Sequence, residues 1–238
     1  MAVRLQLRER ARSPTPRELA DIPWLGMLSD ADRLDVTSHL VVSTAEPGER
    51  VCRFGRASTF WFGVIDGMLK MSNDAAGGAQ ITFTGLPPGA WFGEGTLLKR
   101  EVYRYNIEAL RRSTVAGLPS AVFNHLLDRS IPFNRFVVNQ LNERLGQFIA
   151  AREIDRQNHP DARVARNLAA LFHPVLYPGV GQWLRITQQE LGYLVGLSRQ
   201  RVNQALSALQ RDQMIRIEYG GVRVLDLDRL RQYAPPET

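Results

Sequence analysis

The spacing of apolar residues divides the chain into a β-rich half and a helical half. Between Pro47 and about Leu118, short β-type runs such as "FWFGVI", "QITFTGL" and "TVAGL" are separated by glycine-bearing turns such as "EPGE", "IDG" and "PPGA". Many short strands with regularly spaced turn signals predict a small all-β barrel or sandwich. No long helical pattern alternates with these runs, so a nucleotide-binding βαβ fold is not expected.

From Ser120 onward the spacing becomes helical, and a long amphipathic helix is predicted to end near Asp155. The apolar positions of this helix are Phe133, Val137, Leu141, Leu145 and Phe148. The face expected to be polar carries Asn142, Glu143, Arg144 and Gln147. Such a helix either packs on its own barrel or forms a coiled-coil dimer seam, and we expect the seam.

The stretch "TQQELGYLVGLSRQRVNQAL" predicts two short helices joined by a tight turn. Thr187 and Glu190 have the spacing of a capping box, which starts the first helix. Gly196 can adopt the left-handed conformation that ends this helix, and Ser198 can cap the second. The following "MIRIEYGGVRVLDL" contains two alternating runs joined by Gly-Gly, which is a hairpin signal. Together these elements predict a winged helix-turn-helix.

The second helix offers polar side chains suited to the major groove of double-stranded DNA. Arginine can bind guanine through two hydrogen bonds, and glutamine or asparagine can pair with adenine. The residues expected to face the bases are Ser198, Arg199, Gln200, Asn203 and Gln204, and those expected at the phosphates are Thr187 and Arg201. Alternatively, the winged helix contacts a protein, in which case this face should expose aromatic residues or leucines.

Composition limits the partners and cofactors that the chain can be expected to bind. The formal net charge of +6 permits a polyanionic partner. The single cysteine, Cys52, excludes a disulfide framework and an iron–sulfur cluster held by four cysteines of one chain. The four histidines are scattered without a pattern, so haem is not expected. The sequence shows neither a paired nucleophile and base nor a phosphate-binding loop, so an enzyme is not expected.

"ITQQELGYLVGLSRQRVNQALSALQRDQMI" resembles the DNA-binding motif of the Crp/Fnr superfamily, the cyclic-AMP receptor protein and its relatives. "PGERVCRFGRASTFWFGVIDGMLKM" is similar to the β-roll signature of that family, with Gly48, Gly55 and Gly67 at its turns. The resemblance covers roughly residues 25–226. It implies an α+β chain with an N-terminal double-stranded β-roll like a cyclic-nucleotide-binding domain, a long dimerisation helix and a C-terminal winged helix-turn-helix.

We therefore expect four parts: a basic flexible tail (1–20), a β-roll effector-binding domain (21–130), a dimerisation helix and hinge (131–158) and a DNA-binding domain (159–238). The resemblance implies a homodimeric transcription regulator on a palindromic operator. The loop from Pro174 to Gly181 corresponds to the surface that touches RNA polymerase in activators of this family.

No run approaches the ~20 apolar residues of a membrane span. A cytoplasmic protein without a membrane partner is expected.

The resemblance also bears on the operator and on an effector. In the helix that reads DNA, the best-known members carry an arginine, a glutamate and a second arginine. Arg199 matches the first of these, whereas Gln200 and Gln204 replace the other two. A different operator is therefore expected. "PPGAWFGEGTLL" is similar to the effector-pocket loop, in which the glutamate binds a ribose hydroxyl and an arginine about ten residues later neutralises the phosphate. The residues expected at an effector are Phe92, Gly93, Glu94, Gly95, Thr96, Tyr103, Arg104, Tyr105 and Phe148.

Two departures from this pocket pattern leave the effector open. Arg104 lies at about the right distance from Glu94, but a one-residue gap in the next strand would put Tyr103 in the place of the arginine. Phe148 and Ile149 stand where the family has two hydroxyl residues that contact adenine. Three alternatives follow: cyclic AMP, a different and more apolar or aromatic effector, or a pocket filled by its own side chains.

Overall fold

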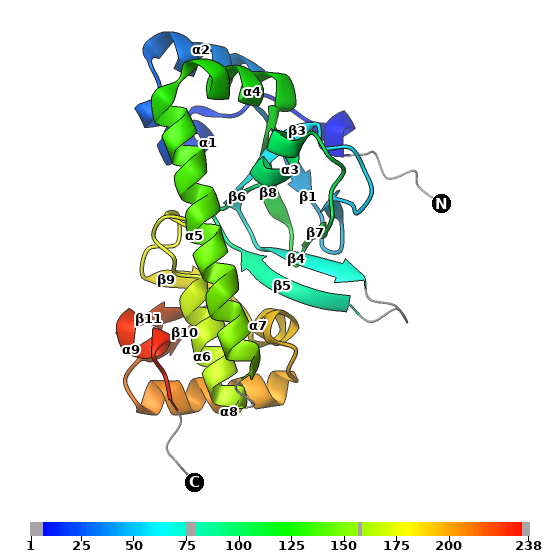
Figure 1. Ribbon diagram of the computed structural model, residues 1–238. Coiled ribbons are helices and arrows are strands. Elements are labelled where there is room, and N and C mark those ends of the chain that lie inside the picture. Colours follow the sequence, from blue (N-terminus) through cyan, green and yellow to red (C-terminus); the bar gives the residue numbers. More distant parts are fainter. Residues whose placement is uncertain (1–6, 75–79, 157–158, 235–238) are drawn as a thin grey trace.

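The structure is a computed structural model that describes residues 7–74, 80–156 and 159–234 of the chain. Figure 1 shows a β-rich domain and a mainly helical C-terminal domain that both lie along the long helix α5 (Ile131–Arg156). The ends of the predicted tail and of the predicted DNA-binding domain, and two residues of the predicted hinge, lie outside the described ranges.

The N-terminal segment is folded against the β-rich domain. Arg12 exchanges two backbone hydrogen bonds with Val42, and its side chain lies 2.5 Å from Glu18 Oε1. The short helix α1 (Pro16–Ala20) begins with a capping box. The expectation of a flexible tail over residues 1–20 is therefore wrong for its described part, because the backbone of Arg12 and the side chains of Arg10 and Arg12 have partners. The other early helices are η1 (Leu7–Arg10), η2 (Pro23–Met27) and α2 (Asp30–His39).

Two antiparallel four-stranded sheets form the predicted double-stranded β-roll. The first has the order β1-β8-β3-β6, with β1 (Val41–Ala45), β8 (Ser113–Pro119), β3 (Phe60–Asp66) and β6 (Trp91–Phe92). The second has the order β2-β7-β4-β5, with β2 (Arg50–Cys52), β7 (Asn106–Ala109), β4 (Leu69–Asp74) and β5 (Gln80–Leu86). Gly67 makes the turn before β4 at φ 111°, and a Cβ there would lie 2.2 Å from Ser113 Oγ.

Helices and aromatic side chains close one side of the β-roll. The helices are α3 (Glu94–Lys99), α4 (Ser120–Arg129) and the first half of α5. Trp24, Trp61 and Trp91 are fully buried with ring centroids 4.3–5.1 Å apart, and Phe123 and Phe133 pack beside them. This cluster anchors the start of α5 to the first sheet.

Helix α5 distributes its apolar residues over two faces rather than one. Phe133 and Val137 are buried in their own chain, whereas Leu145 is 60% exposed. The other outward-facing apolar residues are Ile131, Val138 and Ile149. Arg144, which we expected on the polar face, is buried against the β-roll. The prediction of a single apolar face is therefore wrong, because α5 packs on its own β-roll and also exposes a second apolar stripe.

The C-terminal domain has the predicted winged helix-turn-helix. Helix α6 (Pro160–Ala170) precedes β9 (Trp183–Arg185), and α7 (Gln188–Val195) and α8 (Arg199–Arg211) form the two-helix motif. The hairpin β10 (Ile215–Glu218) and β11 (Gly221–Val224) pairs with β9 in the order β10-β11-β9. The last described helix is α9 (Leu227–Arg231).

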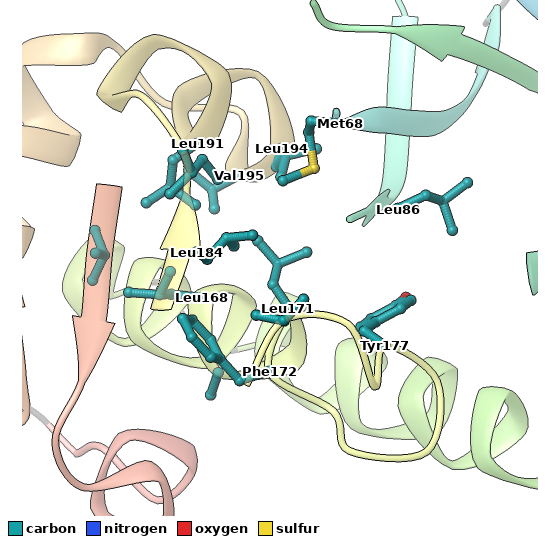
Figure 2. Close-up of a cluster of buried hydrophobic side chains, with 14 of the residues drawn as sticks. Met68, Leu86, Leu168, Leu171, Phe172, Tyr177, Leu184, Leu191, Leu194 and Val195 are labelled. Carbon is teal, nitrogen blue, oxygen red and sulfur yellow. The ribbon is translucent and has the colours of Figure 1, made fainter. Parts of the chain in front are cut away.

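The two domains share one continuous hydrophobic core. Figure 2 shows Met68 and Leu86 of the β-roll facing Leu171, Tyr177 and Leu194 of the C-terminal domain. All five side chains are at most 7% exposed. The docking is close enough that a Cβ on residue 85 of β5 would lie 2.8 Å from Leu194 Cδ1. No helix in the described part of the chain is long and apolar enough to cross a bilayer.

Candidate nucleic-acid interface and effector site

Local sequence signals fix the two helices of the helix-turn-helix. The Thr187 hydroxyl accepts a hydrogen bond from the Glu190 amide at 3.1 Å, and Glu190 Oε2 accepts one from the Thr187 amide at 2.7 Å. This is the predicted capping box. Gly196 ends α7 at φ 67°, and the Ser198 hydroxyl caps α8 by accepting from the Arg201 amide. Each of these residues therefore has a structural role in addition to any contact with DNA.

Helix α8 turns one face to the core and the other to solvent. Its inner face consists of Val202, Ala205, Leu206 and Leu209, which are buried. The exposed residues of its first two turns are Arg199, Gln200, Asn203 and Gln204, and the capping Ser198 is exposed as well. The structure thus brings the five predicted base-facing residues together on one accessible surface, which we call the reading face.

A hydrogen-bonded pair between the two helices was not anticipated from the sequence. Gln188, the first residue of α7, donates from Nε2 to Asn203 Oδ1 at 2.9 Å. Its Oε1 accepts from Arg199 Nε at 3.5 Å, near the long limit for a hydrogen bond. Sequence reasoning treated Gln188 only as part of a helix start, because its position relative to α8 depends on how the helices cross.

Arg201, which we expected to contact DNA phosphates, is not free at the surface. Its Nη1 lies 2.6 Å from Asp161 Oδ1 of α6, and its side chain is half-buried. A phosphate contact by Arg201 would compete with this ion pair. Thr187, the other predicted phosphate contact, is exposed but uses its hydroxyl in the helix cap.

A groove of about 440 Å³ lies beside the reading face. It is lined by the start of α7, by Arg199 and Leu206 of α8, and by the hairpin around Gly220. Tyr219 stands fully exposed at the tip of that hairpin. Residues from three separate segments therefore frame the surface on which α8 presents its polar side chains.

In the β-roll, Glu94 is a buried carboxylate paired with Arg144. Gly93 precedes α3 at φ 99°, and Glu94 begins the helix. Arg144 Nε donates to Glu94 Oε1 at 3.2 Å, and Arg144 Nη2 donates to the Trp91 carbonyl at 2.7 Å. Burial opposes the charge on Arg144, but attraction by Glu94 and by the nearby tyrosine hydroxyls holds its pKa above the usual value.

Apolar and aromatic groups surround this pair. Phe92 is fully buried, and Tyr103 donates from its hydroxyl to the Phe60 carbonyl at 3.2 Å. Burial raises the pKa of Tyr103 and Tyr105, and the nearby Glu94 raises that of Tyr105 further. Burial also raises the pKa of the Cys52 thiol to about 12, so this cysteine is not a reactive thiolate.

The remaining predicted effector residues divide into two groups. Gly95 and Thr96 are half-buried beside Glu94, and Phe148 is half-buried against the shared core. Arg104, by contrast, is 75% exposed and forms an ion pair with Glu101 at 3.0 Å. The expectation that Arg104 lines the pocket is therefore wrong, because its side chain points to solvent. The buried arginine beside Glu94 comes instead from α5, 50 residues later in the chain.

Comparisons with known proteins agree with both halves of the fold. A model of the cyclic nucleotide-binding domain matches residues 42–130, and a model of the Crp-like helix-turn-helix domain matches residues 162–233. The Cyclic AMP receptor protein of Thermus thermophilus is 27% identical over 171 residues, which are 72% of this chain and 77% of that protein.

Two further relatives extend the comparison. The CRP-like cAMP-activated global transcriptional regulator of Mycobacterium tuberculosis is 26% identical over 210 residues, which are 82% of this chain and 84% of that protein. The structure of FixK2 from Bradyrhizobium japonicum has a TM-score of 0.64 at 14% identity and covers 84% of this chain and 99% of that chain. That structure shows the same overall fold.

Proposed function

We propose that this chain, a transcription regulator of the Crp/Fnr superfamily, binds a palindromic site in double-stranded DNA as a homodimer with α8 in the major groove. The observation that carries the proposal is the exposed face of α8, where Arg199, Gln200, Asn203 and Gln204 lie together. These are the side-chain types that read base edges in the major groove. The Mycobacterium tuberculosis relative is named as a transcriptional regulator, and the proposal includes no catalytic step.

The exposed face of α8 does not favour the alternative of a protein-docking winged helix. A docking surface for protein is enriched in aromatic and other large apolar side chains. Among the described residues, no large hydrophobic side chain of α8 is exposed. The polar composition of this face therefore supports DNA as the partner.

A regulator that binds DNA acts where the DNA is, so we place the protein in the cytoplasm.

The homodimer is supported by the outward stripe of α5. Ile131, Val138 and Leu145 lie one heptad apart, and Ile149 extends the same surface. Their exposed fractions are 56–68%, which leaves a long apolar surface open to water in a single chain. A heptad of apolar residues is the pattern that joins two helices in a coiled coil. A second copy of the chain would cover this stripe and place two reading helices on one DNA site.

The Arg144–Glu94 pair supports the alternative in which the β-roll is filled by its own side chains. Glu94 is only 2% exposed, and the charges of Glu94 and Arg144 already balance each other inside the β-roll. We therefore propose that DNA binding does not require cyclic AMP. An effector that did enter would need a donor for Glu94 Oε2 and an acceptor for Arg144 Nη1, which are both buried and have no hydrogen-bond partner among the described residues.

An activator role with RNA polymerase is proposed for the loop 174–181. Tyr177 anchors the loop by donating to Gln147 of α5 at 3.1 Å, and Gln140 donates to the Val175 carbonyl at 2.9 Å. Pro174, Pro178 and Gly179 remain exposed at its surface. A loop that is held rigidly and exposed in this way is a suitable contact for another protein.

Selection of genomic DNA fragments by the purified protein, without ligand and at near-physiological salt, tests the function. Recovery of one palindromic motif would support the regulator and show that the ligand-free protein is sufficient. Retention that is weak, salt-sensitive and independent of sequence would contradict ligand-free sequence recognition, because phosphate contacts alone behave in this way. Repeating the selection with cyclic AMP separates a requirement for that effector from a failure to bind DNA.

A further inference from the structure

We infer that Gln188 is a positioning residue that decides whether Asn203, on the reading face, presents hydrogen-bond donors or acceptors to DNA. Through Gln188, Asn203 turns its amide NH2 group toward DNA and selects bases that present an acceptor. The inference rests on the proposed function, because it concerns how the same α8 surface distinguishes bases. It assigns a specificity role to a residue of α7, outside the helix that enters the groove.

The argument starts at Arg199, whose guanidinium group can only donate hydrogen bonds. Arg199 Nε approaches one end of the Gln188 amide at 3.5 Å. That end must be the oxygen, because the alternative orientation would turn the NH2 group of Gln188 toward another donor. The chemistry of arginine therefore determines which way the Gln188 amide faces, although oxygen and nitrogen have nearly the same shape.

The orientation of Gln188 then determines that of Asn203. With its oxygen toward Arg199, Gln188 presents Nε2 to Asn203 at 2.9 Å. The atom of Asn203 that meets this donor must be its oxygen, Oδ1. Asn203 is exposed, and within the described chain no hydrogen bond engages its Nδ2. Two N–H donors of Asn203 are thus left for a base edge.

This polarity changes what Asn203 is expected to read. Adenine is recognised by asparagine through the amide oxygen and the amide nitrogen together. Here Gln188 Nε2 occupies one lone pair of the oxygen and holds the oxygen toward α7, so the two-bond pairing with adenine is disfavoured. Acceptors in the major groove are guanine O6 and N7, adenine N7 and thymine O4. Asn203 should therefore favour guanine or thymine and disfavour cytosine, whose N4 group is a donor.

The same contact prepares Arg199 for guanine. Gln188 engages Nε, on the side of the guanidinium group nearest the helix. The two terminal nitrogens remain as a fork that matches guanine O6 and N7. One glutamine thus orients two reading side chains, and a change at Gln188 should alter base preference at two positions of the operator.

The test is selection from a randomised DNA library, followed by sequencing, with wild type and three variants. Asn203→Ala marks the base position that Asn203 reads. Gln188→Glu keeps the contact to Arg199 but presents only acceptors, so Asn203 must turn its NH2 group inward and its oxygen outward. Gln189→Glu is the matched control, since it adds the same charge to the exposed neighbour on α7. A glutamate in this first turn is compatible with the helix dipole, so both variants should fold.

At the position marked by Asn203→Ala, wild type should prefer guanine or thymine. Gln188→Glu should shift this preference toward adenine or cytosine by at least about five-fold, consistent with the energy of one base contact. Gln189→Glu should lower total affinity without changing the preferred base. A clear wild-type motif with the same preference in Gln188→Glu would overturn this inference alone. If wild type selects no motif, the proposed function fails and this inference fails with it.

Discussion

Arg111 of the β-roll lies 3.3 Å from Glu190 of α7, across the boundary between the two domains. Arg111 also donates to the Arg185 carbonyl at 2.6 Å, so it contacts two elements of the C-terminal domain. Burial lowers the pKa of Arg111, and Glu190 offsets part of that effect. Because Glu190 also closes the capping box of α7, the same carboxylate joins the helix start to the β-roll.

We predict that Arg111→Met loosens the contact between the domains. The variant removes the counter-charge of the buried Glu190 carboxylate and one donor to the Arg185 carbonyl. The free energy of unfolding should fall by roughly 1.5–3 kcal/mol in urea denaturation. Amide hydrogen exchange in α7 should rise, because the helix start loses a contact.

The neighbouring arginine provides the control for Arg111→Met. Arg112 is 76% exposed and lies 3.6 Å from Glu46. A surface pair of this kind contributes about 0–1 kcal/mol, so Arg112→Met should change stability little. Equal effects of the two substitutions would show that the interdomain contact of Arg111 has no special role.

The crossing of α7 and α8 should not tolerate a methyl group at Gly192. A Cβ at this position would lie 2.8 Å from the Leu197 carbonyl oxygen, which belongs to the backbone and cannot turn away. Gly192→Ala should therefore destabilise the protein by about 1–3 kcal/mol, measured by thermal unfolding, and weaken DNA binding. Gly26→Ala serves as the control, because no atom of the described residues lies within 4 Å of a Cβ there. An unaffected Gly192→Ala variant would contradict the close crossing.

The parts of the site that the sequence predicted are those set by neighbouring residues. The capping box at Thr187, the glycine turn at Gly196 and the cap at Ser198 depend on spacings of a few residues, and the structure has all three. The polar outer face of α8 follows from helical periodicity once the inner face is identified. The order of strands and helices was predictable for the same reason, since turns and periodicity are local signals.

The parts that were missed depend on contacts between distant segments. Periodicity placed Arg144 on the polar face of its helix, but its partner Glu94 lies in another element, and only the packing of α5 brings them together. Sequence distance suggested Arg104 as the buried cation, although that side chain points outward. Gln188 was missed because its contacts arise from the crossing angle of two helices.

Replacing only one member of the Arg144–Glu94 pair should destabilise the protein much more than replacing both. Arg144→Met leaves a buried carboxylate without its counter-charge, and the free energy of unfolding should fall by about 3–5 kcal/mol at neutral pH. The double variant Arg144→Met/Glu94→Gln should recover much of this loss, because no charge remains buried. Urea denaturation of the two single variants and the double variant measures the coupling. Losses that simply add would show that the residues act independently.

A charge in the α5 stripe should separate the proposed dimer. Leu145 is 60% exposed in the single chain, so Leu145→Arg should fold normally while placing a charge in the seam. Light scattering coupled to size-exclusion chromatography should show a dimer for wild type and a monomer for the variant. Leu34→Arg is the control, since Leu34 is 74% exposed on α2 and should not affect assembly. A Leu145→Arg protein that remains dimeric would place the interface elsewhere.

The loop 174–181 should be held less firmly as pH falls, because His173 must stay neutral to accept its hydrogen bonds. His173 Nδ1 accepts hydrogen bonds from the amides of Val175 and Leu176 at 3.3 and 3.2 Å, and its Nε2 lies 3.2 Å from Glu143. A proton on Nδ1 would displace both amide contacts. Burial lowers the pKa of His173, although Glu143 opposes this shift.

The sign of the pH effect follows from this lowered pKa. The unfolded chain takes up the proton first, near an ordinary histidine pKa of about 6.5. The contribution of His173 to stability is therefore complete above that pH and is lost as pH falls through the lower pKa of the folded state. His173→Asn keeps an acceptor for the amides but does not titrate. The stability of wild type relative to this variant should decline between roughly pH 7 and pH 5, measured by urea denaturation. A constant difference over that range would show that His173 does not control the acid sensitivity of the loop.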